Sequence, residues 1–530
     1  MDSLDVAPFF MTFMTFLLPA LFAVSGILCG LSRLERRAAC IALWSVRGAP
    51  LLLVGILSFW LVTKPDPQAA FHGSLLSALM LILVVFMAWV LVQFSQHYMK
   101  GEQRVAQYYR WLMLTLAAVT LTLSSNHLLG FWIGWVGISL GLHFLLTFYP
   151  ERPRAILAAH KKFILARVAE LSLLVAFALL YWEHQTWYLL ELMSHIGGTL
   201  SWSEQVAACL IAVAALMKCA QLPVHGWLMQ VVEAPTPISA LLHAGIINLG
   251  GYLVLTFYPL LHLSHSATWL LLIVAGFTTL FSALIMTTRI SVKVRLAWST
   301  SAQMGLMLLE CALGLYELAV LHLLTHSVYK AHAFLNSSSA VQEFLTRRAA
   351  PDDTPNPIIW LSAFLFSVAT VIFSALFWHY QGPMSPWLLM ALALTVLVAQ
   401  GRSIPKPVPW PRLLMLTFGL SLLYGGLKTT LGWLFHGHIA AHTEIPWSAA
   451  DLWVSGIFIS LFVLAVCLRY YAHLAWVNRF SVILFAGLYM DEWFTKVTLK
   501  IWPVALPAYS KAKHHGVSLL FPNLSKGWKK

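Results

Sequence analysis

The sequence predicts an all-α polytopic membrane protein with about fifteen transmembrane helices, at least one of them broken. Three observations carry this prediction. The 530 residues are 60% hydrophobic and only 10% charged, whereas soluble domains carry roughly 25% charged residues. The apolar residues form runs of about 20, which match the thickness of a bilayer's hydrocarbon core. The basic residues outside these runs gather in alternate loops, as in membrane proteins of fixed orientation.

Each apolar run is expected to form one helix. The first follows an acidic N-terminus, Met1–Asp5, and is expected to be a span, because a secretory signal begins with basic residues. The run at 205–219 is expected to continue past a break. The expected helices cover residues 8–30, 40–62, 75–97, 109–125, 127–149, 161–182, 205–219, 236–257, 267–287, 295–313, 318–340, 358–380, 386–400, 412–435 and 450–468.

The basic residues of the loops predict the orientation. Only Lys64 falls in the loops of one side, and the loops of the other side hold the rest. Because basic loops face the cytoplasm, the N-terminus is expected outside and the C-terminus in the cytoplasm. The residues on the expected cytoplasmic side are Arg33, Arg36, Arg37, Lys100, Arg104, Arg110, Arg152, Arg154, Lys161, Lys162, Arg289, Lys293, Arg295, Arg347, Arg348, Arg402, Lys406 and Arg412.

Residues 476–530 form an amphipathic and basic tail. Tyr489, Trp493 and Val497 recur at intervals of four, which predicts a helix lying along the membrane surface. The chain after residue 468 is too short for a long lateral helix. The net charge of +13 is explained by the loops and this tail, which fits anionic membrane lipid or a cytoplasmic partner. Nucleic acid is therefore not an expected partner.

Neither a metal site nor a cofactor is expected in this chain. The six cysteines stand alone, without a Cys-x-x-Cys pair, so iron–sulfur and zinc sites are not indicated. His322 and His326 have the i,i+4 spacing of zinc ligands, but no carboxylate or cysteine nearby in the sequence completes the set.

Lys218 is the most informative charge, because it ends a long apolar run. An ionised lysine at the middle of a transmembrane helix costs about 2.5–3.5 kcal/mol, so such residues face the protein interior or water. Pro223 follows shortly after and frees the Cys219 carbonyl, which predicts a break in the helix. Irregular backbone at membrane depth is stable only inside protein or beside a hydrated cavity. Snorkelling to the surface is the alternative.

Histidines extend this set of titratable groups. His243 lies in the apolar run after the break, and His322, His326 and Lys330 recur at intervals of four, which places them on one face of a helix. A lone buried histidine is usually a core residue. Three titratable groups on one face favour a proton relay.

Few acids accompany these bases. Arg167 and Glu170 lie three residues apart and can form an ion pair. That pair either neutralises itself or modulates the charge of Lys218. Glu310 also lies in an apolar run, and the sequence assigns it no partner.

These motifs resemble the antiporter-like subunits of respiratory complex I and of Mrp-type cation antiporters. The resemblance covers roughly residues 120–345. Segment 217–254, from Met-Lys-Cys-Ala-Gln-Leu-Pro to Leu-Leu-His-Ala, is similar to the family's broken helix and its follower, and segment 293–340, with His-Leu-Leu-Thr-His-Ser-Val-Tyr-Lys, is similar to the next signature. The resemblance implies ion translocation by Lys218, His243, His322, His326 and Lys330, with Arg167 and Glu170 beside the broken helix.

The resemblance also implies four parts of the chain: 1–120, N-terminal helices; 121–345, the antiporter-like ion-translocating core; 346–475, C-terminal helices; and 476–530, the cytoplasmic tail. Two family features are missing. The gating glutamate of a Trp-Glu pattern is replaced in Gly134-Trp135-Val136-Gly137, and residues 355–411 offer no lysine within a span for a second broken helix.

The simplified second half looks like the DabB-type membrane subunits of bacterial inorganic-carbon complexes. That resemblance implies a multi-pass subunit of the bacterial inner (plasma) membrane, which conducts protons or Na⁺ and is not itself an enzyme. It also implies a cytoplasmic, zinc-binding, carbonic-anhydrase-like partner of the DabA type. A subunit of an NADH-quinone oxidoreductase, a hydrogenase or an Mrp Na⁺/H⁺ antiporter is the alternative, and a membrane anchor with a vestigial channel is a third.

Overall fold

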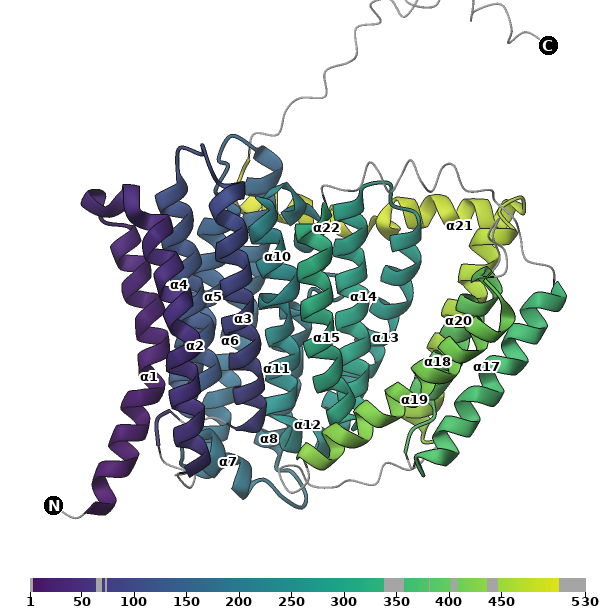
Figure 1. Ribbon diagram of the computed structural model, residues 1–530, viewed down its shortest axis with the longest axis horizontal. Helices are drawn as coiled ribbons and strands as arrows, with labels where there is room; N and C mark the ends of the chain where they lie inside the picture. The colour runs from purple at the N-terminus through teal and green to yellow at the C-terminus, as the bar shows by residue number, and fades with distance from the viewer. Residues whose placement is uncertain are drawn as a thin grey trace, which may run out of the picture.

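The chain folds into a broad layer of long helices that stand side by side (Figure 1). The computed structural model describes residues 3–62, 69–71, 74–337, 357–380, 382–401, 408–435 and 447–504. Within these ranges the secondary structure is helical, without a named strand. Most buried apolar side chains form one continuous core that runs through the layer.

The first half of the layer runs from α1 to α9. Its helices are α1 (Ser3–Cys29), η1 (Ser32–Arg37), α2 (Ala38–Val62), α3 (Leu75–Tyr98), α4 (Val105–Ser124), α5 (Leu128–Leu146), α6 (Pro153–His184), α7 (Leu189–His195), α8 (Trp202–Lys218) and α9 (Gly226–Gln230).

The second half begins with short helices and ends with two that lie across the layer. These are η2 (Val231–Glu233), α10 (Thr236–Ala244), η3 (Ile246–Asn248), α11 (Leu249–Thr256), α12 (Tyr258–Leu263), α13 (His265–Thr287), α14 (Val292–Ala312), α15 (Tyr316–Leu335), α17 (Pro357–Phe377), α18 (Ser385–Gly401), α19 (Trp410–Phe435), α20 (Ala449–Tyr470), α21 (Ala475–Phe485), η5 (Gly487–Tyr489) and α22 (Met490–Ile501).

Ten segments of the described chain are helical, long and apolar enough to cross a membrane. The predicted helical membrane fold is thus confirmed, whereas the count of fifteen spans is not. Every expected run contains a helix, but α8 and α18 have only 17 residues each, and α4, α14 and α15 carry too many polar side chains to qualify by composition. The polar residues of α15 include His322, His326 and Lys330 of the predicted relay.

The run expected as one helix at 236–257 is interrupted. α10 ends at Ala244, a 3-10 turn occupies Ile246–Asn248, and α11 starts at Leu249. The sequence analysis missed this second break because the run is mostly apolar and has no proline after Pro237. The structure shows Gly245 at its start, with φ −128° and ψ −71°, outside the helical region.

Lys161 and Lys162 were wrongly placed in a loop. α6 begins at Pro153, which fits the first turn of a helix because that turn needs no backbone donor. Both lysines therefore lie inside α6 and are buried. Their sequence neighbours are apolar, so the true start of the helix could have been found from the proline.

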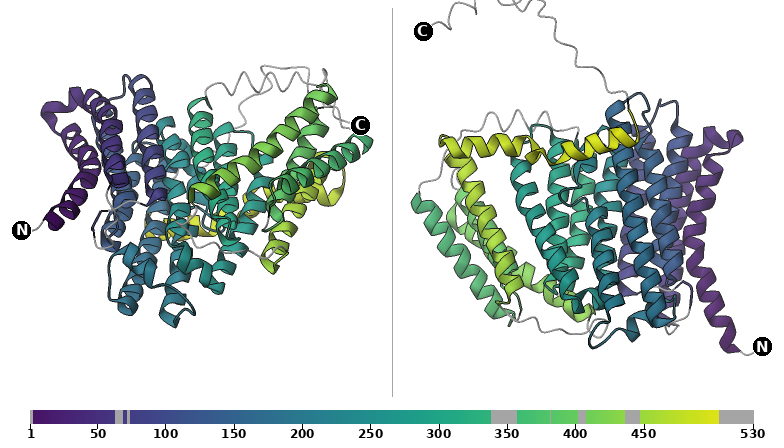
Figure 2. Two further views of the ribbon diagram at one scale, coloured as in Figure 1. Left: turned by 60° about the horizontal axis from the view of Figure 1, so that its bottom comes forward. Right: turned by 180° about the vertical axis from the view of Figure 1, so that it is seen from behind.

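α21 and α22 lie across one end of the layer, the top in Figure 1, and the start of α1 lies at the opposite end. Figure 2 shows the same pair from behind, running from α20 toward the first half of the layer. The predicted surface helix is thus present as α22. Phe494 and Thr498 are its buried side chains, while Trp493 and Val497 are exposed. The chain after residue 468 was expected to be too short for a long lateral helix, but α21 and α22 together extend along much of this face (Figure 2).

Some predicted features lie outside the described residues. These are Lys64, Arg347, Arg348, Arg402, Lys406 and the basic tail from residue 505 onward.

Candidate ion pathway

The predicted break follows α8. Its last residue is Lys218, and α9 begins only at Gly226, beyond Pro223. Neighbouring helices satisfy the irregular backbone. Ser301 Oγ of α14 donates to the Ala220 carbonyl at 3.0 Å, and Thr278 Oγ1 of α13 accepts from Leu222 N at 3.0 Å. Buried polar side chains thus give the backbone of this non-helical segment the hydrogen-bond partners that lipid cannot provide.

Lys218 faces the protein interior. Its Nζ lies 4.4 Å from the centre of the Trp135 ring, within the range of a cation–π contact. Lys218 and Trp135 line a cavity of about 30 Å³ between α5, α6 and α8, together with Lys162 and Glu170. A cavity of this size holds one or two water molecules. Snorkelling to the surface is therefore excluded for Lys218.

Lys162 is a member of this site that the sequence analysis missed. Its Nζ donates to the Ser139 carbonyl of α5 at 2.5 Å. Two lysines, Lys162 and Lys218, thus share one cavity with a single lining carboxylate, Glu170. The signal in the sequence is the spacing of eight between Lys162 and Glu170, which puts both on one face of α6.

Arg167 and Glu170 form the predicted ion pair, with Nη2 and Oε2 2.7 Å apart. Arg167 Nη2 also donates to Ser139 Oγ at 2.5 Å. The carboxylate is buried and interacts electrostatically with Lys218. Val136 stands where the family's glutamate was expected, so Glu170 supplies the acid near Lys218 from the neighbouring helix.

His243 lies at the second break, near the end of α10. Its Nδ1 is 3.1 Å from Thr300 Oγ1 of α14, and its ring stacks on Phe334 of α15 with centres 4.3 Å apart. In the described structure its Nε2 has no hydrogen-bond partner. Thr300 and Ser301 are adjacent, so α14 holds both breaks through consecutive side chains.

The three predicted residues of α15 follow each other along the helix. Lys330 is 0% exposed, and its Nζ donates to Ser299 Oγ at 2.8 Å and to the Leu296 carbonyl at 3.1 Å. His326 is buried, and neither ring nitrogen has a partner in the described part of the chain. Its ring centre lies 6.1 Å from that of His322, and His243 packs against the same helix through Phe334.

Glu310, which had no partner in the sequence analysis, contacts His322. Its carboxylate oxygens lie 3.0 and 3.2 Å from His322 Nδ1, and His322 Nε2 lies 2.8 Å from Gln303 Oε1. Glu310 and Gln303 come from α14, while His322 comes from α15. Sequence spacing could not reveal this contact, because it joins two helices across a turn.

The arrangement consists of Lys162, Lys218 and Glu170 around one cavity, and of a series of titratable groups that runs from His243 through Lys330, His326 and His322 to Glu310. Such a series can pass protons through short side-chain movements and bound water. Within the described ranges, no three His, Cys, Asp or Glu side chains come together to hold a metal ion.

The chain matches known protein families. Residues 125–354 match the model described as "NADH:quinone oxidoreductase/Mrp antiporter, TM", and residues 60–109 match "NADH-Ubiquinone oxidoreductase (complex I), chain 5 N-terminus". The chain is 44% identical to the "Probable inorganic carbon transporter subunit DabB" of Hydrogenovibrio crunogenus, over 94% of this chain and 96% of that protein. The chain belongs to the DabB family of antiporter-like membrane subunits.

A second relative and a solved structure extend the comparison. The "Probable inorganic carbon transporter subunit DabB2" of Halothiobacillus neapolitanus is 34% identical over 79% of this chain and 78% of that protein. The Mrp complex from Dietzia sp. DQ12-45-1b contains a chain that shares the fold, with a TM-score of 0.59 at 20% identity. The match covers 93% of this chain and 60% of that one.

Proposed function

We propose that this chain is the cation-translocating membrane subunit of an inorganic-carbon (CO₂/bicarbonate) uptake complex, with the proton as the moving ion. The observation that carries the proposal is the pair of broken helices. Lys218 ends the first, and His243 lies at the second beside Lys330, His326 and His322 of α15. Histidine favours the proton, because imidazole exchanges protons near neutral pH. The assignment of inorganic carbon as the substrate rests on the names of the DabB relatives.

The chain is expected to work with a cytoplasmic zinc subunit that resembles a carbonic anhydrase. Proton flow through the membrane subunit would then drive hydration of CO₂ in the partner, which holds the zinc chemistry. We place the complex in the bacterial inner membrane, with the basic loops and α22 on the cytoplasmic side. The basic loop residues that the structure describes support this orientation.

Lys218→Met tests the proposal. It removes the charge at the cavity while keeping the length of the side chain, so inorganic-carbon-dependent growth at low CO₂ should be lost although the subunit is still inserted. Lys100→Met, in the exposed turn after α3, is the matched control and should grow normally. Growth of Lys218→Met at the control rate would refute the proposal.

Co-purification tests the partner. A large cytoplasmic zinc protein bound to the tagged subunit supports the proposal. Flavin or iron–sulfur subunits in its place would instead assign the chain to a redox-driven complex.

A further inference from the structure

Glu310 stands at the end of the pathway that lies away from α21 and α22. It belongs to the last turn of α14, Val292–Ala312, and His322 lies in the second turn of α15. The turn between these helices is at the opposite end of the layer from α21 and α22 (Figure 1). Lys330 lies eight residues beyond His322, which corresponds to about 12 Å along the helix axis. The series on α15 thus descends through the layer toward Glu310.

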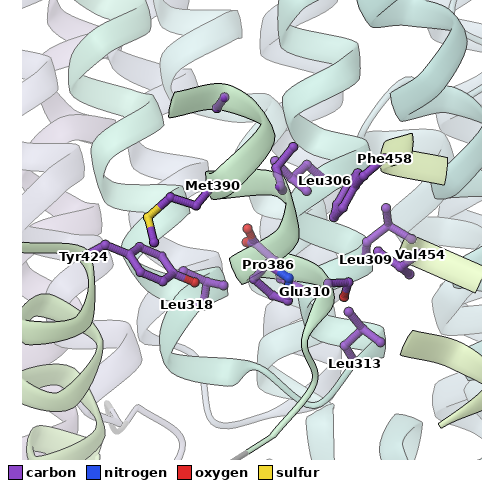
Figure 3. A pocket seen from close by; sticks show the side chains of 13 residues that line it. Leu306, Leu309, Glu310, Leu313, Leu318, Pro386, Met390, Tyr424, Val454 and Phe458 are labelled. Atoms are coloured by element: carbon purple, nitrogen blue, oxygen red, sulfur yellow. The ribbon is translucent and has the colours of Figure 1, made fainter. Parts of the chain in front are cut away.

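Glu310 also lines a cavity between the core and the C-terminal helices. The cavity has a volume of about 160 Å³, and α14, α15, α18, α19 and α20 contribute to its wall. Figure 3 shows Glu310 and Tyr424 among the side chains that line it. Its volume is enough for several water molecules.

Most of the cavity wall is apolar, but its polar groups can hold water. Ser385 is 0% exposed and lines the same cavity. Its Oγ has no hydrogen-bond partner within the described residues. A buried hydroxyl without a partner is costly unless water binds it. Ser385 and the Glu310 carboxylate therefore mark where water would enter.

The hydrogen bonds of His322 determine how many protons it shares with Glu310. Gln303 Oε1 can only accept, so His322 Nε2 keeps its hydrogen. One proton then lies between Nδ1 and the carboxylate: either imidazolium faces carboxylate, or neutral imidazole faces carboxylic acid. Transfer from Nδ1 to Glu310 leaves His322 neutral. Release of that proton to cavity water restores the carboxylate.

We infer that Glu310 is the terminal proton acceptor of this chain and that its cavity is the hydrated exit toward the side opposite α21 and α22. This inference rests on the proposed function. It explains how the pathway can end although the spans expected from 358 to 400 carry no lysine. Gln303 acts through His322 as a positioning residue.

Proton flux into liposomes tests the inference. The purified full chain is reconstituted together with the subunits that copurify with it. A potassium diffusion potential then drives protons into the liposomes, and a pH-sensitive dye inside them reports the flux. We expect Glu310→Gln to lower the flux at least tenfold and Glu310→Asp to retain most of it. Glu317→Gln removes an acid in the first turn of α15 that does not line the cavity, and it should match the wild type.

Two further measurements separate a proton-carrying role from a structural one. Ser385→Leu fills part of the cavity without changing Glu310 and should also lower the flux. In infrared difference spectra between two pH values, the carbonyl band of a carboxylic acid should change in the wild type and be reduced in Glu310→Gln. An unchanged spectrum in Glu310→Gln would overturn the inference.

Lys218→Met in the same assay distinguishes the two proposals. Lost flux in Lys218→Met together with normal flux in Glu310→Gln or in Ser385→Leu would overturn the role of Glu310 and its cavity alone. Normal flux in Lys218→Met would overturn the proposed function itself.

Discussion

An ion pair between Lys161 and Asp491 joins α6 to α22, two helices that are far apart in the sequence. Lys161 Nζ and Asp491 Oδ2 are 2.7 Å apart, with side chains 0% and 30% exposed. Gln230 Nε2 of α9 also donates to Asp491 Oδ2, at 3.0 Å. The lysine next to Lys161 lies in the Lys218 cavity. α22 therefore contacts α6, which contributes to that cavity, and α9, which follows the break.

We predict that Asp491→Asn loosens α22. The substitution keeps the shape of the side chain but leaves the Lys161 ammonium buried without its counter-charge. Removing one partner of a buried pair costs about 3–5 kcal/mol. Because Asp491 is partly exposed, water can offset some of this loss, and we expect about 2–3 kcal/mol. Each 1.4 kcal/mol corresponds to about a tenfold change in an equilibrium constant, so opening of α22 should become about 30 to 140 times more frequent.

Hydrogen exchange of the α22 amides, measured by mass spectrometry on the purified subunit, checks this value. Glu492→Gln is the matched control, because it removes the neighbouring, exposed acid of the same helix. The double variant Lys161→Met/Asp491→Leu should recover much of the protection, since no unpaired charge remains. Equal exchange in Asp491→Asn and Glu492→Gln would refute the reasoning.

Two further predictions concern the same machinery. Gly226→Ala should raise hydrogen exchange in α22 as Asp491→Asn does, because the added methyl group would clash with the Asp491 carboxylate. Gly456→Ala is its control, since a methyl group there meets nothing within 4 Å. Normal exchange in Gly226→Ala would contradict the close contact. His326→Ala should reduce proton flux at least tenfold, because it interrupts the series on α15. The ring nitrogens make no hydrogen bond in the described structure, so the loss of thermal stability should be that of the cavity left by the ring. A loss of stability with unchanged flux would show that the residue is only structural.

The sequence by itself determined those features that depend on local order along the chain. Runs of about 20 apolar residues predict membrane helices, and Pro223 after Lys218 predicts the break, because a missing backbone donor acts within one turn. The spacing of His322, His326 and Lys330 places them on one face by helix geometry alone. The family motifs then added Arg167, Glu170 and His243 to the expected set. In the structure Glu170 lines the Lys218 cavity, and His243 packs against α15.

Only the tertiary structure decided which buried groups meet. Glu310 contacts His322 because α14 and α15 pack side by side, and Lys162 shares a cavity with Lys218 because α6 packs against α8. Asp491 reaches Lys161 from a helix more than 300 residues away in sequence. In a low-dielectric interior an unpaired charge or hydroxyl is costly, so packing selects arrangements in which such groups find partners or water. Which groups become partners depends on how helices distant in sequence pack together, and a local pattern of residues does not encode that packing.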